Sequence, residues 1–318
     1  MRIAIFGAEE DPITRALVRE VAACGDQALI VEFDALERGL PVGTADDKLL
    51  YRGERLDQVD GAILRFIPAP SVPVLEEAGE LRLYEDWYAA FMQAREKAAF
   101  YMSWLLQLEL AGVPLVNPPQ AGSVHQFKPF QLDVLRRAGA RVPRTLITND
   151  PAAVEAFARE IGEVIYKPVM GGALTRVLDA EARSRLELIT HSPVIFQERA
   201  AGDDVRVTLV GDRVVSTTVI EVEEGNVDYR GDAQYAGGHG RYREVAVPEA
   251  VIAHCREAMR TCKLEFAGID LKHRGDDWVF LELNSSPVYL EIEQQLGHPI
   301  SRELVAHVRR RAAARSGR

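Results

Sequence analysis

The stretch from Phe266 to Pro287, FAGIDLKHRGDDWVFLELNSSP, constrains the fold of this 318-residue chain more than any other stretch. Apolar and polar residues alternate from Ala267 to His273 and again from Trp278 to Leu283, which predicts two β-strands. Between them stands Gly275-Asp276-Asp277, a sequence typical of a turn. We therefore expect an antiparallel hairpin in which Arg274 pairs with Trp278.

This register gathers oxygen-bearing side chains on one face of the hairpin. Residues two apart along a strand share a face, and so do residues directly opposite each other on paired strands. Asp270 then lies opposite Glu282, with Asn284 next to Glu282 on the same face. Mg²⁺ prefers such ligands and takes only one or two carboxylates besides substrate phosphates. The hairpin predicts a magnesium site, and the alternative is a solvated face with ordinary surface acids.

The composition excludes several classes of function. A formal net charge of -10 argues against broad nucleic-acid binding, which needs clustered Lys and Arg. No apolar run reaches membrane-spanning length, and no secretory leader precedes the strand-like Arg2–Phe6. Cys24, Cys255 and Cys262 lack the spacing of metal ligands. We expect no membrane partner and a cytoplasmic location, with Cys255 and Cys262 as core thiols.

The N-terminal part has the order of a small parallel α/β domain. Residues 2–7 predict a strand, and Asp11-Pro12 predicts the cap and first position of a helix that ends near Cys24. Strands are expected over residues 28–33 and 61–67. The first strand is not followed by the GxGxxG of a dinucleotide site. A long helix is expected over residues 81–111, with its aromatic residues in the core or at a subunit contact.

The middle of the chain combines two lysines with a glycine loop. Lys128 begins a predicted helix, and Lys167 lies at the exit of the predicted strand Val164–Pro168. Gly171-Gly172 follows. Glycine lets backbone N–H groups approach phosphate oxygens, and lysine supplies a point charge. A simple hairpin turn remains the alternative. Residues 226–241, which include Arg230, predict a mobile loop.

Taken in order, these pieces resemble the ATP-grasp superfamily, and most nearly its branch of ribosomal-protein glutamate ligases and prokaryotic glutathione synthetase. The resemblance covers about residues 115–300. It is carried by Lys128, Tyr166-Lys167-Pro168 with Gly171-Gly172, Gln197-Glu198, Gly202-Asp203-Asp204-Val205-Arg206, Gly211-Asp212, Arg230, Gly237-Gly238, Gly268-Ile269-Asp270 and Glu282-Leu283-Asn284-Ser285-Ser286-Pro287.

The resemblance implies an α/β (α+β) ATP-grasp fold in three parts. These are an N-terminal parallel α/β pre-grasp domain over residues 1–118, a small central lid over 119–192, and a C-terminal antiparallel-sheet domain with the metal site over 193–318. It also implies ATP and Mg²⁺ as cofactors, with Mn²⁺ as a substitute metal, and a dimer or tetramer.

The resemblance further implies the roles of individual residues. Asp270, Glu282 and Asn284 would bind the metal, and Arg206 and Arg230 would be the active-site arginines, whose fork suits carboxylate and phosphate. The segment 197–200 would be the hinge that meets adenine through backbone groups, with Glu198 and Asp204 making the polar contacts to base and ribose. The full set that would hold ATP is Lys128, Lys167, Gly171, Gly172, Gln197, Glu198, Arg199, Ala200 and Asp204.

The implied activity is an ATP-dependent carboxylate–amine ligase that forms an amide through an acyl phosphate, on an amino acid or a peptide. One version modifies a ribosomally made precursor peptide by side-chain amide or ester formation, with the helix over residues 81–111 as a docking surface. A nucleotide-binding scaffold and ATP-dependent phosphorylation stay open as rivals. Relatives carry Asn where Asp232 stands, and the roles of His125 and His239 beside the site are open.

Overall fold

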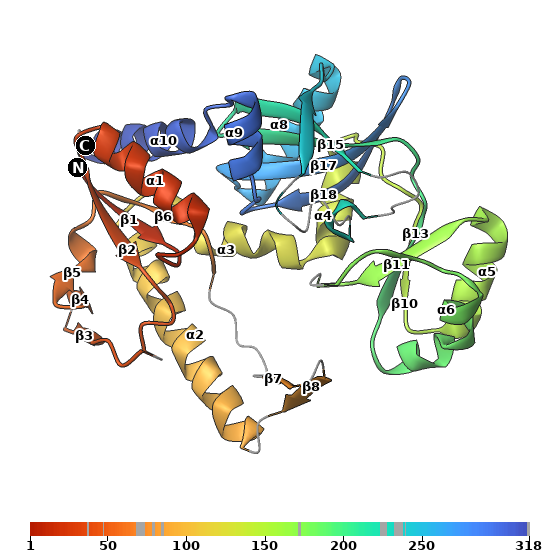
Figure 1. The fold of residues 1–318 in the computed structure, drawn as a ribbon, viewed down its shortest axis with the longest axis horizontal. Coiled ribbons are helices and arrows are strands. Elements are labelled where there is room, and N and C mark those ends of the chain that lie inside the picture. The colour runs from red at the N-terminus through yellow and green to blue at the C-terminus, as the bar shows by residue number, and fades with distance from the viewer. Residues whose placement is uncertain are drawn as a thin grey trace. The chain divides into compact units, whose positions relative to one another are not determined.

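The structure is a computed structural model (Figure 1) that describes residues 1–36, 38–46, 48–67, 74–77, 80–83, 86–170, 173–222, 228–231, 238 and 240–316. The chain divides into two compact units. The first is Met1–Gly122 together with the segment from Ser301 onward, and the second is Ser123–Ile300. Within the ranges described, no helix has both the length and the apolar character needed to cross a bilayer.

The first unit is built on a parallel four-stranded sheet in the order β2-β1-β6-β9. Its strands are β1 (Arg2–Phe6), β2 (Gln27–Val31), β6 (Gly61–Leu64) and β9 (Leu115–Val116). The predicted cap of α1 (Pro12–Ala23) is confirmed, because the Asp11 side chain accepts hydrogen bonds from the backbone of Ile13 and Thr14. Thus the predicted parallel α/β arrangement is present.

The remaining elements of this unit are short, apart from two helices. They are β3 (Val42–Ala45), β4 (Lys48–Tyr51), β5 (Glu54–Arg55), η1 (Leu56–Gln58), β7 (Val74–Glu77), β8 (Glu80–Leu83), α2 (Trp87–Leu110), α3 (Pro119–Gly122) and α10 (Ile300–Ser316).

The long helix α2 begins later than predicted. Residues 81–83 belong to strand β8, so the expected start at Leu81 is wrong. Tyr101 and Trp104, in the C-terminal half of the helix, are buried in the core of the unit. Trp87 and Tyr88, at its beginning, are exposed. The aromatic residues of this helix are therefore core in one half and surface in the other.

The second unit contains a small sheet in the order β10-β13-β11-β12. We call this sheet and the elements on it the lid. They are β10 (Thr145–Thr148), α5 (Pro151–Ile161), β11 (Val164–Pro168), β12 (Arg176–Val177), α6 (Ala180–Ser184), η3 (Leu186–His191) and β13 (Val194–Glu198). Val154, Val164 and Phe196 belong to an apolar cluster between this sheet and its helices.

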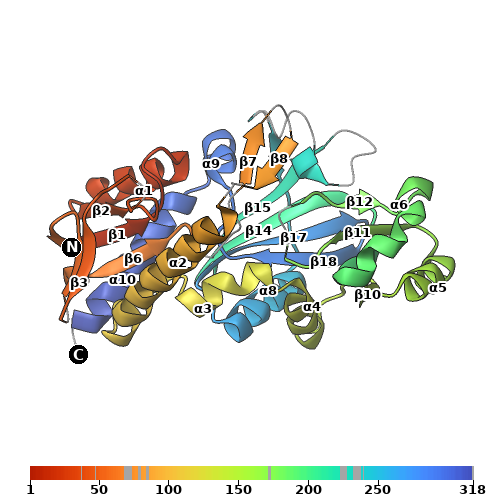
Figure 2. The same ribbon diagram turned by 90° about the horizontal axis from the view of Figure 1, so that it is seen from below.

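A five-stranded antiparallel sheet, in the order β16-β15-β14-β17-β18, forms the rest of the second unit. Helices α4 and α8 lie on one face of it (Figure 2). Its strands and neighbours are η2 (Ser123–Gln126), α4 (Lys128–Arg137), β14 (Asp203–Val210), β15 (Arg213–Glu221), η4 (Tyr229–Gly231), β16 (Arg241–Glu244), α8 (Glu249–Cys262), β17 (Phe266–Arg274), β18 (Asp277–Asn284) and α9 (Leu290–Leu296).

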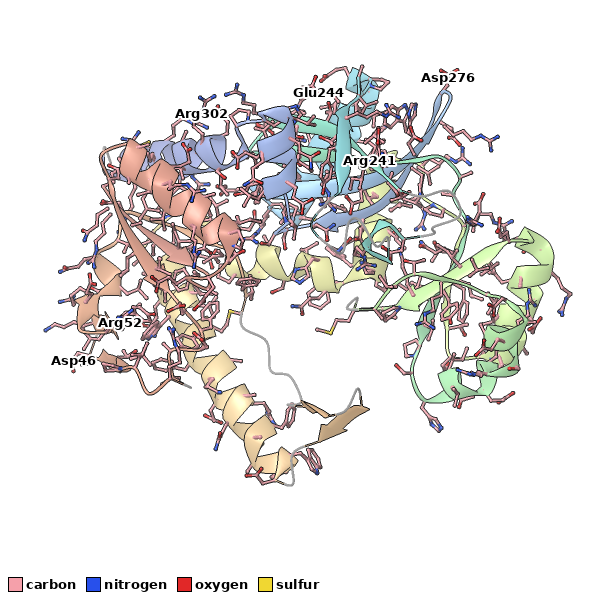
Figure 3. The ribbon with its side chains drawn as sticks, viewed as in Figure 1. Asp46, Arg52, Arg241, Glu244, Asp276 and Arg302 are labelled. Atoms are coloured by element: carbon pink, nitrogen blue, oxygen red, sulfur yellow. The ribbon has the colours of Figure 1, made fainter. Side chains whose placement is uncertain are left out.

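Two details of this part of the second unit bear on the sequence predictions. Cys255 and Cys262 are buried on α8, as expected for core thiols. Strand β16 was missed, because Arg241 to Glu244 is charged rather than alternating. It is an edge strand, and charged side chains such as Arg241 and Glu244 (Figure 3) discourage pairing with another chain.

The β17–β18 hairpin forms as predicted, but its turn is one residue shorter. Arg274 pairs with Asp277 rather than with Trp278. A β-bulge then shifts the register by one residue beyond Leu271, and Asp270 lies opposite Glu282 as expected. The predicted pairing of the two acids is right, although the predicted turn is wrong.

Candidate functional site

The two acids of the hairpin converge with Asn284 on one face of the five-stranded sheet. The Nδ2 atom of Asn284 donates to Asp270 Oδ2 at 2.9 Å and to Glu282 Oε1 at 3.3 Å. Asp270 is 6% exposed. Two carboxylates and one amide within hydrogen-bond reach are a donor set that suits Mg²⁺. Among the described residues no cluster of three His, Cys, Asp or Glu side chains competes with it for a metal.

Each of these acids faces a cation of the same chain. The Arg206 guanidinium donates two hydrogen bonds to Asp270, from Nε at 2.8 Å and from Nη2 at 2.9 Å. Lys128 Nζ donates to Glu282 Oε2. Burial would raise the pKa of Glu282, but the charges of Lys128 and Lys167 outweigh it and lower that pKa to about 2. Burial raises the pKa of Asp270, and the charge of Arg206 opposes the rise.

Lys167 is the most perturbed cation of the site. It is 8% exposed, and burial lowers its pKa to about 8. In the part of the chain that the structure describes, its ammonium makes no hydrogen bond or ion pair. A buried ammonium of this kind needs an anionic partner. A phosphate group of a bound nucleotide would be such a partner.

Arg230 is held by a residue that the sequence analysis missed. Asp228 accepts from Arg230 Nε at 2.9 Å and Nη2 at 2.5 Å, and from the backbone N of Thr175 at 2.9 Å. Burial opposes ionisation, but the hydrogen bonds from Arg230 and Thr175 lower the pKa of Asp228 to about 2. The Asp228-Tyr229-Arg230 spacing was available in the sequence, within a segment predicted only as a loop.

The proposed hinge holds one unsatisfied buried atom. Gln197 is 1% exposed, and its Nε2 donates to Thr145 Oγ1 at 2.9 Å. Its Oε1 has no hydrogen-bond partner. A buried acceptor of this kind suits the exocyclic amine of adenine. Glu198, in contrast, accepts from the backbone of Arg144, and Arg199 pairs with Glu163.

The other predicted site residues have mixed positions. Asp204 is buried and pairs with Lys272 at 2.8 Å, a lysine that strand alternation from Asp270 could have found. His125 hydrogen-bonds Ser285 Oγ at 3.0 Å. Ala200, the last residue of the predicted hinge, is half-buried. The predicted residues Gly171, Gly172, Asp232, Gly237 and His239 lie outside the described residues.

Lys167, Asp228, Arg230, Asp270 and Glu282 line one small pocket of about 50 Å³. This volume holds a cation and a few waters. A nucleotide needs several hundred Å³. A triphosphate would fit here only if the lid, which carries Lys167, moved relative to the five-stranded sheet.

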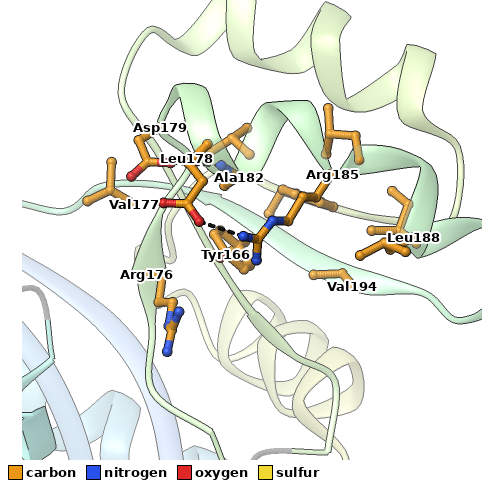
Figure 4. Close-up of a pocket in the computed structure, with 13 residues that line it drawn as sticks. Tyr166, Arg176, Val177, Leu178, Asp179, Ala182, Arg185, Leu188 and Val194 are labelled. Carbon is orange, nitrogen blue, oxygen red and sulfur yellow. Dashed lines mark hydrogen bonds and ion pairs between the residues drawn. The ribbon is translucent and has the colours of Figure 1, made fainter.

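A much larger cavity of about 500 Å³ lies on the other face of the lid sheet. Figure 4 shows it between strand β11 and the segment of α6 and η3. Its apolar wall includes Leu178, Val194 and Phe196, and the Glu181–Arg185 ion pair of 2.7 Å stands at its edge. No motif in the sequence predicted it, because it is made of ordinary apolar residues.

Comparisons with known proteins identify the fold and the chemistry. A family model described as the RimK-like ATP-grasp domain matches residues 126–308, more than half of the chain. The chain belongs to the RimK-like ATP-grasp family. The predicted ATP-grasp fold and ligase class are thereby confirmed: the chain is an ATP-dependent carboxylate–amine ligase of a family that uses ATP and Mg²⁺.

Individual relatives are similar over nearly their whole length. The chain is 25% identical to the ribosomal protein bS6–L-glutamate ligase of Escherichia coli O81 (strain ED1a), covering 98% of this chain and 97% of that protein. It is 29% identical to the solved ATP-grasp ligase PsnB complexed with a minimal precursor, with a TM-score of 0.81 over 97% of this chain and 98% of PsnB. The macrocyclase MdnC from Microcystis aeruginosa MRC, solved with precursor peptide MdnA, shares the fold at 19% identity and a TM-score of 0.76, over 96% of this chain and 98% of MdnC.

Proposed function

We propose that this ligase acts on a peptide, and joins a side-chain carboxylate of a ribosomally made precursor to an amine or a hydroxyl group. The observation that carries the proposal is the apolar cavity of about 500 Å³ on the lid. It is separate from the small charged pocket of about 50 Å³, which we propose binds phosphate and call the phosphate pocket. A free amino acid needs no apolar cavity away from the reacting atoms, whereas a peptide gains affinity there. The 29% identity to PsnB, which was solved with a precursor, supports the same substrate class.

Residues in and around the phosphate pocket would divide the work of activation. Lys128 and Lys167 would hold the phosphates, and Gln197 would meet adenine through its unsatisfied Oε1. Asp270, Glu282 and Asn284 would hold Mg²⁺, or Mn²⁺ in its place, and the metal would supply charge neutralisation of the phosphate oxygens.

Arg230 would orient the substrate carboxylate for attack on the γ-phosphate, since its position is fixed by Asp228 and its fork suits two oxygens. Arg206 is 3% exposed and holds Asp270 in place, so we give it a positioning role.

The cavity would bind an apolar segment of the peptide outside the reacting region. Leu188 lines it and is 72% exposed, so its side chain is available at the rim. The beginning of α2, with exposed Trp87 and Tyr88, is the competing surface that the sequence suggested. The two surfaces lie in different units and can be tested independently.

The experiment compares Leu188→Asp with Tyr88→Asp, two exposed positions at which a charge is tolerated by the fold. ADP release is measured against the concentration of a precursor-like peptide. Leu188→Asp is expected to raise the KM for the peptide by about tenfold and to leave the KM for ATP unchanged. If only Tyr88→Asp raises the peptide KM, the docking surface is α2. If neither variant changes it, the cavity does not bind the substrate.

Addition of free glutamate is the second candidate, favoured by the 25% identity to the bS6–L-glutamate ligase. ADP release that depends on free glutamate as the amine, with a single peptide supplying the carboxylate, would favour it. A non-catalytic scaffold is disfavoured because Asp270, Glu282 and Asn284 are all present and converge. We also propose that the protein is cytoplasmic and forms a homo-oligomer.

A further inference from the structure

The two acids proposed for the metal are held by cations in different ways. Arg206 binds Asp270 with two hydrogen bonds and also donates to the backbone oxygen of Val288 at 3.0 Å. Its side chain is 3% exposed. Lys128 reaches Glu282 through one ammonium at the end of a flexible four-carbon chain, and its side chain is 11% exposed. The first cation is held by several hydrogen bonds, whereas the second is held at its carboxylate by one.

A divalent cation and Lys128 compete for the same carboxylate. Mg²⁺ binds carboxylate oxygens directly at about 2.0–2.1 Å, so a metal that binds Glu282 through Oε2 would have to displace the Lys128 ammonium from that oxygen. Displacing Lys128 would leave a largely buried ammonium without a partner, which is costly. Nucleotide phosphate removes this cost, because it offers Lys128 another anion.

From this geometry we infer that Lys128 is a counter-ion shared between Glu282 and the nucleotide phosphates, which makes metal binding conditional on nucleotide. The inference rests on the proposed metal site and says in which order that site is filled. Linkage then requires that nucleotide and metal raise each other's affinity by the same factor. Arg206 does not take part in this exchange, since its hydrogen bonds to Asp270 and Val288 hold it in place.

Lys167, which lines the same pocket as Glu282, provides a matched control. Its charge also acts on Glu282, but the only ammonium for which a hydrogen bond to Glu282 is seen in the described residues is that of Lys128. If the effect were general electrostatics, removing either charge would strengthen metal binding alike. If Lys128 also blocks the carboxylate by contact, its removal will strengthen metal binding more than the removal of Lys167 does.

The experiment uses Mn²⁺ alone as the probe and the full chain as wild type, Lys128→Met and Lys167→Met. Water-proton relaxation enhancement reports Mn²⁺ bound to protein and separates it from Mn²⁺ on free nucleotide. Without nucleotide, we expect Lys128→Met to bind Mn²⁺ about tenfold more tightly than wild type, and Lys167→Met to change the affinity by no more than about twofold. The Lys128→Met/Glu282→Gln double variant is expected to lose the gain.

The outcomes separate this inference from the proposed function. Equal effects of Lys128→Met and Lys167→Met would overturn the counter-ion role while leaving the metal site intact. Absence of Mn²⁺ on wild type even with the non-hydrolysable analogue AMPPNP would overturn the metal site as well. Should Lys128→Met fail to fold, the wild type still decides: Mn²⁺ affinity that is the same with and without AMPPNP contradicts the inference.

Discussion

Two pockets of the second unit lie on opposite faces of the same strand, β11. Lys167 points into the phosphate pocket, and its neighbour Tyr166 lines the apolar cavity of the lid. The phosphate pocket is about 50 Å³ and is lined mainly by charged side chains, whereas the cavity is about 500 Å³ and has an apolar wall. Strand alternation therefore places two different binding surfaces on two adjacent residues.

The difference between the pockets teaches what each one contributes to a ligase. Charges buried in a narrow pocket are expensive, and they are kept where chemistry needs preorganised charge. An apolar cavity costs less to maintain and supplies affinity without chemistry. We therefore expect changes in the phosphate pocket to alter turnover and nucleotide binding, and changes in the cavity to alter peptide binding alone.

The largest expected effect is that of Glu282→Gln. Loss of the carboxylate removes one of two acidic ligands for Mg²⁺, and turnover measured by ADP release should fall by roughly 10³-fold or more. Peptide binding in the cavity, measured by fluorescence anisotropy, should stay unchanged. Glu181→Gln, an exposed acid at the cavity edge, is the matched control and should keep normal turnover. Turnover of Glu282→Gln within tenfold of wild type would remove Glu282 from the metal site.

The same contrast explains what the sequence could predict. Asp270, Glu282 and Asn284 were found because carboxylates and amides at strand spacing have few structural uses in a buried sheet. Asp270 and Glu282 were predicted to lie opposite each other although the predicted turn was one residue too long. The β-bulge between Asp270 and Leu271, which was not predicted, shifts the register by one residue and compensates for that error. The acid Asp228 and strand β16 were missed because they lie in or beside a segment without alternation.

The cavity could not be predicted by the same means. Leu178, Val194 and Phe196 are apolar residues of a kind found in any protein core. The space between them arises only from the way the short elements of the lid pack together. For the same reason the sequence could not predict that Trp87 is exposed while Trp104, on the same helix, is buried. The difference depends on which part of the helix the rest of the unit packs against.

The second effect in size is that of Lys167→Met, which should trade nucleotide affinity for stability. Without the ammonium, the Kd for ATP should rise by about 10- to 100-fold. The folded protein should become more stable at pH 7 by on the order of 2 kcal/mol, because burial lowers the pKa of Lys167 from 10.5 to about 8 and so disfavours its charged form.

The pH dependence of this gain follows from proton linkage. Between pH 8 and 10.5 the unfolded chain binds the Lys167 proton and the folded chain does not, so wild-type stability rises across that window. The advantage of Lys167→Met should be full below pH 8 and should shrink as the pH rises towards 10.5. Chemical denaturation of both proteins at several pH values measures it. A constant difference would mean that Lys167 is not a buried charge.

The smallest expected effect, and the one that tests how separate the two pockets are, is that of Asp228→Asn. Asp228 holds Arg230 in the phosphate pocket and also accepts from the backbone of Thr175, next to Arg176 and Val177 of the cavity wall. Loss of its charge weakens the hold on Arg230, so kcat should fall by about tenfold.

This variant is expected to act on both sides of the lid, unlike Glu282→Gln. The Thr175 contact should weaken, and the KM for the peptide should rise by about twofold to threefold as the neighbouring cavity wall loosens. Asp212→Asn, in the exposed β14–β15 turn, is the control and should change neither parameter. Because the pKa of Asp228 is lowered to about 2, its carboxylate is ionised throughout the range from about pH 5 to 9, and the defect should be constant there. A fall in kcat with an unchanged peptide KM would show that the two pockets are independent even where one side chain touches both.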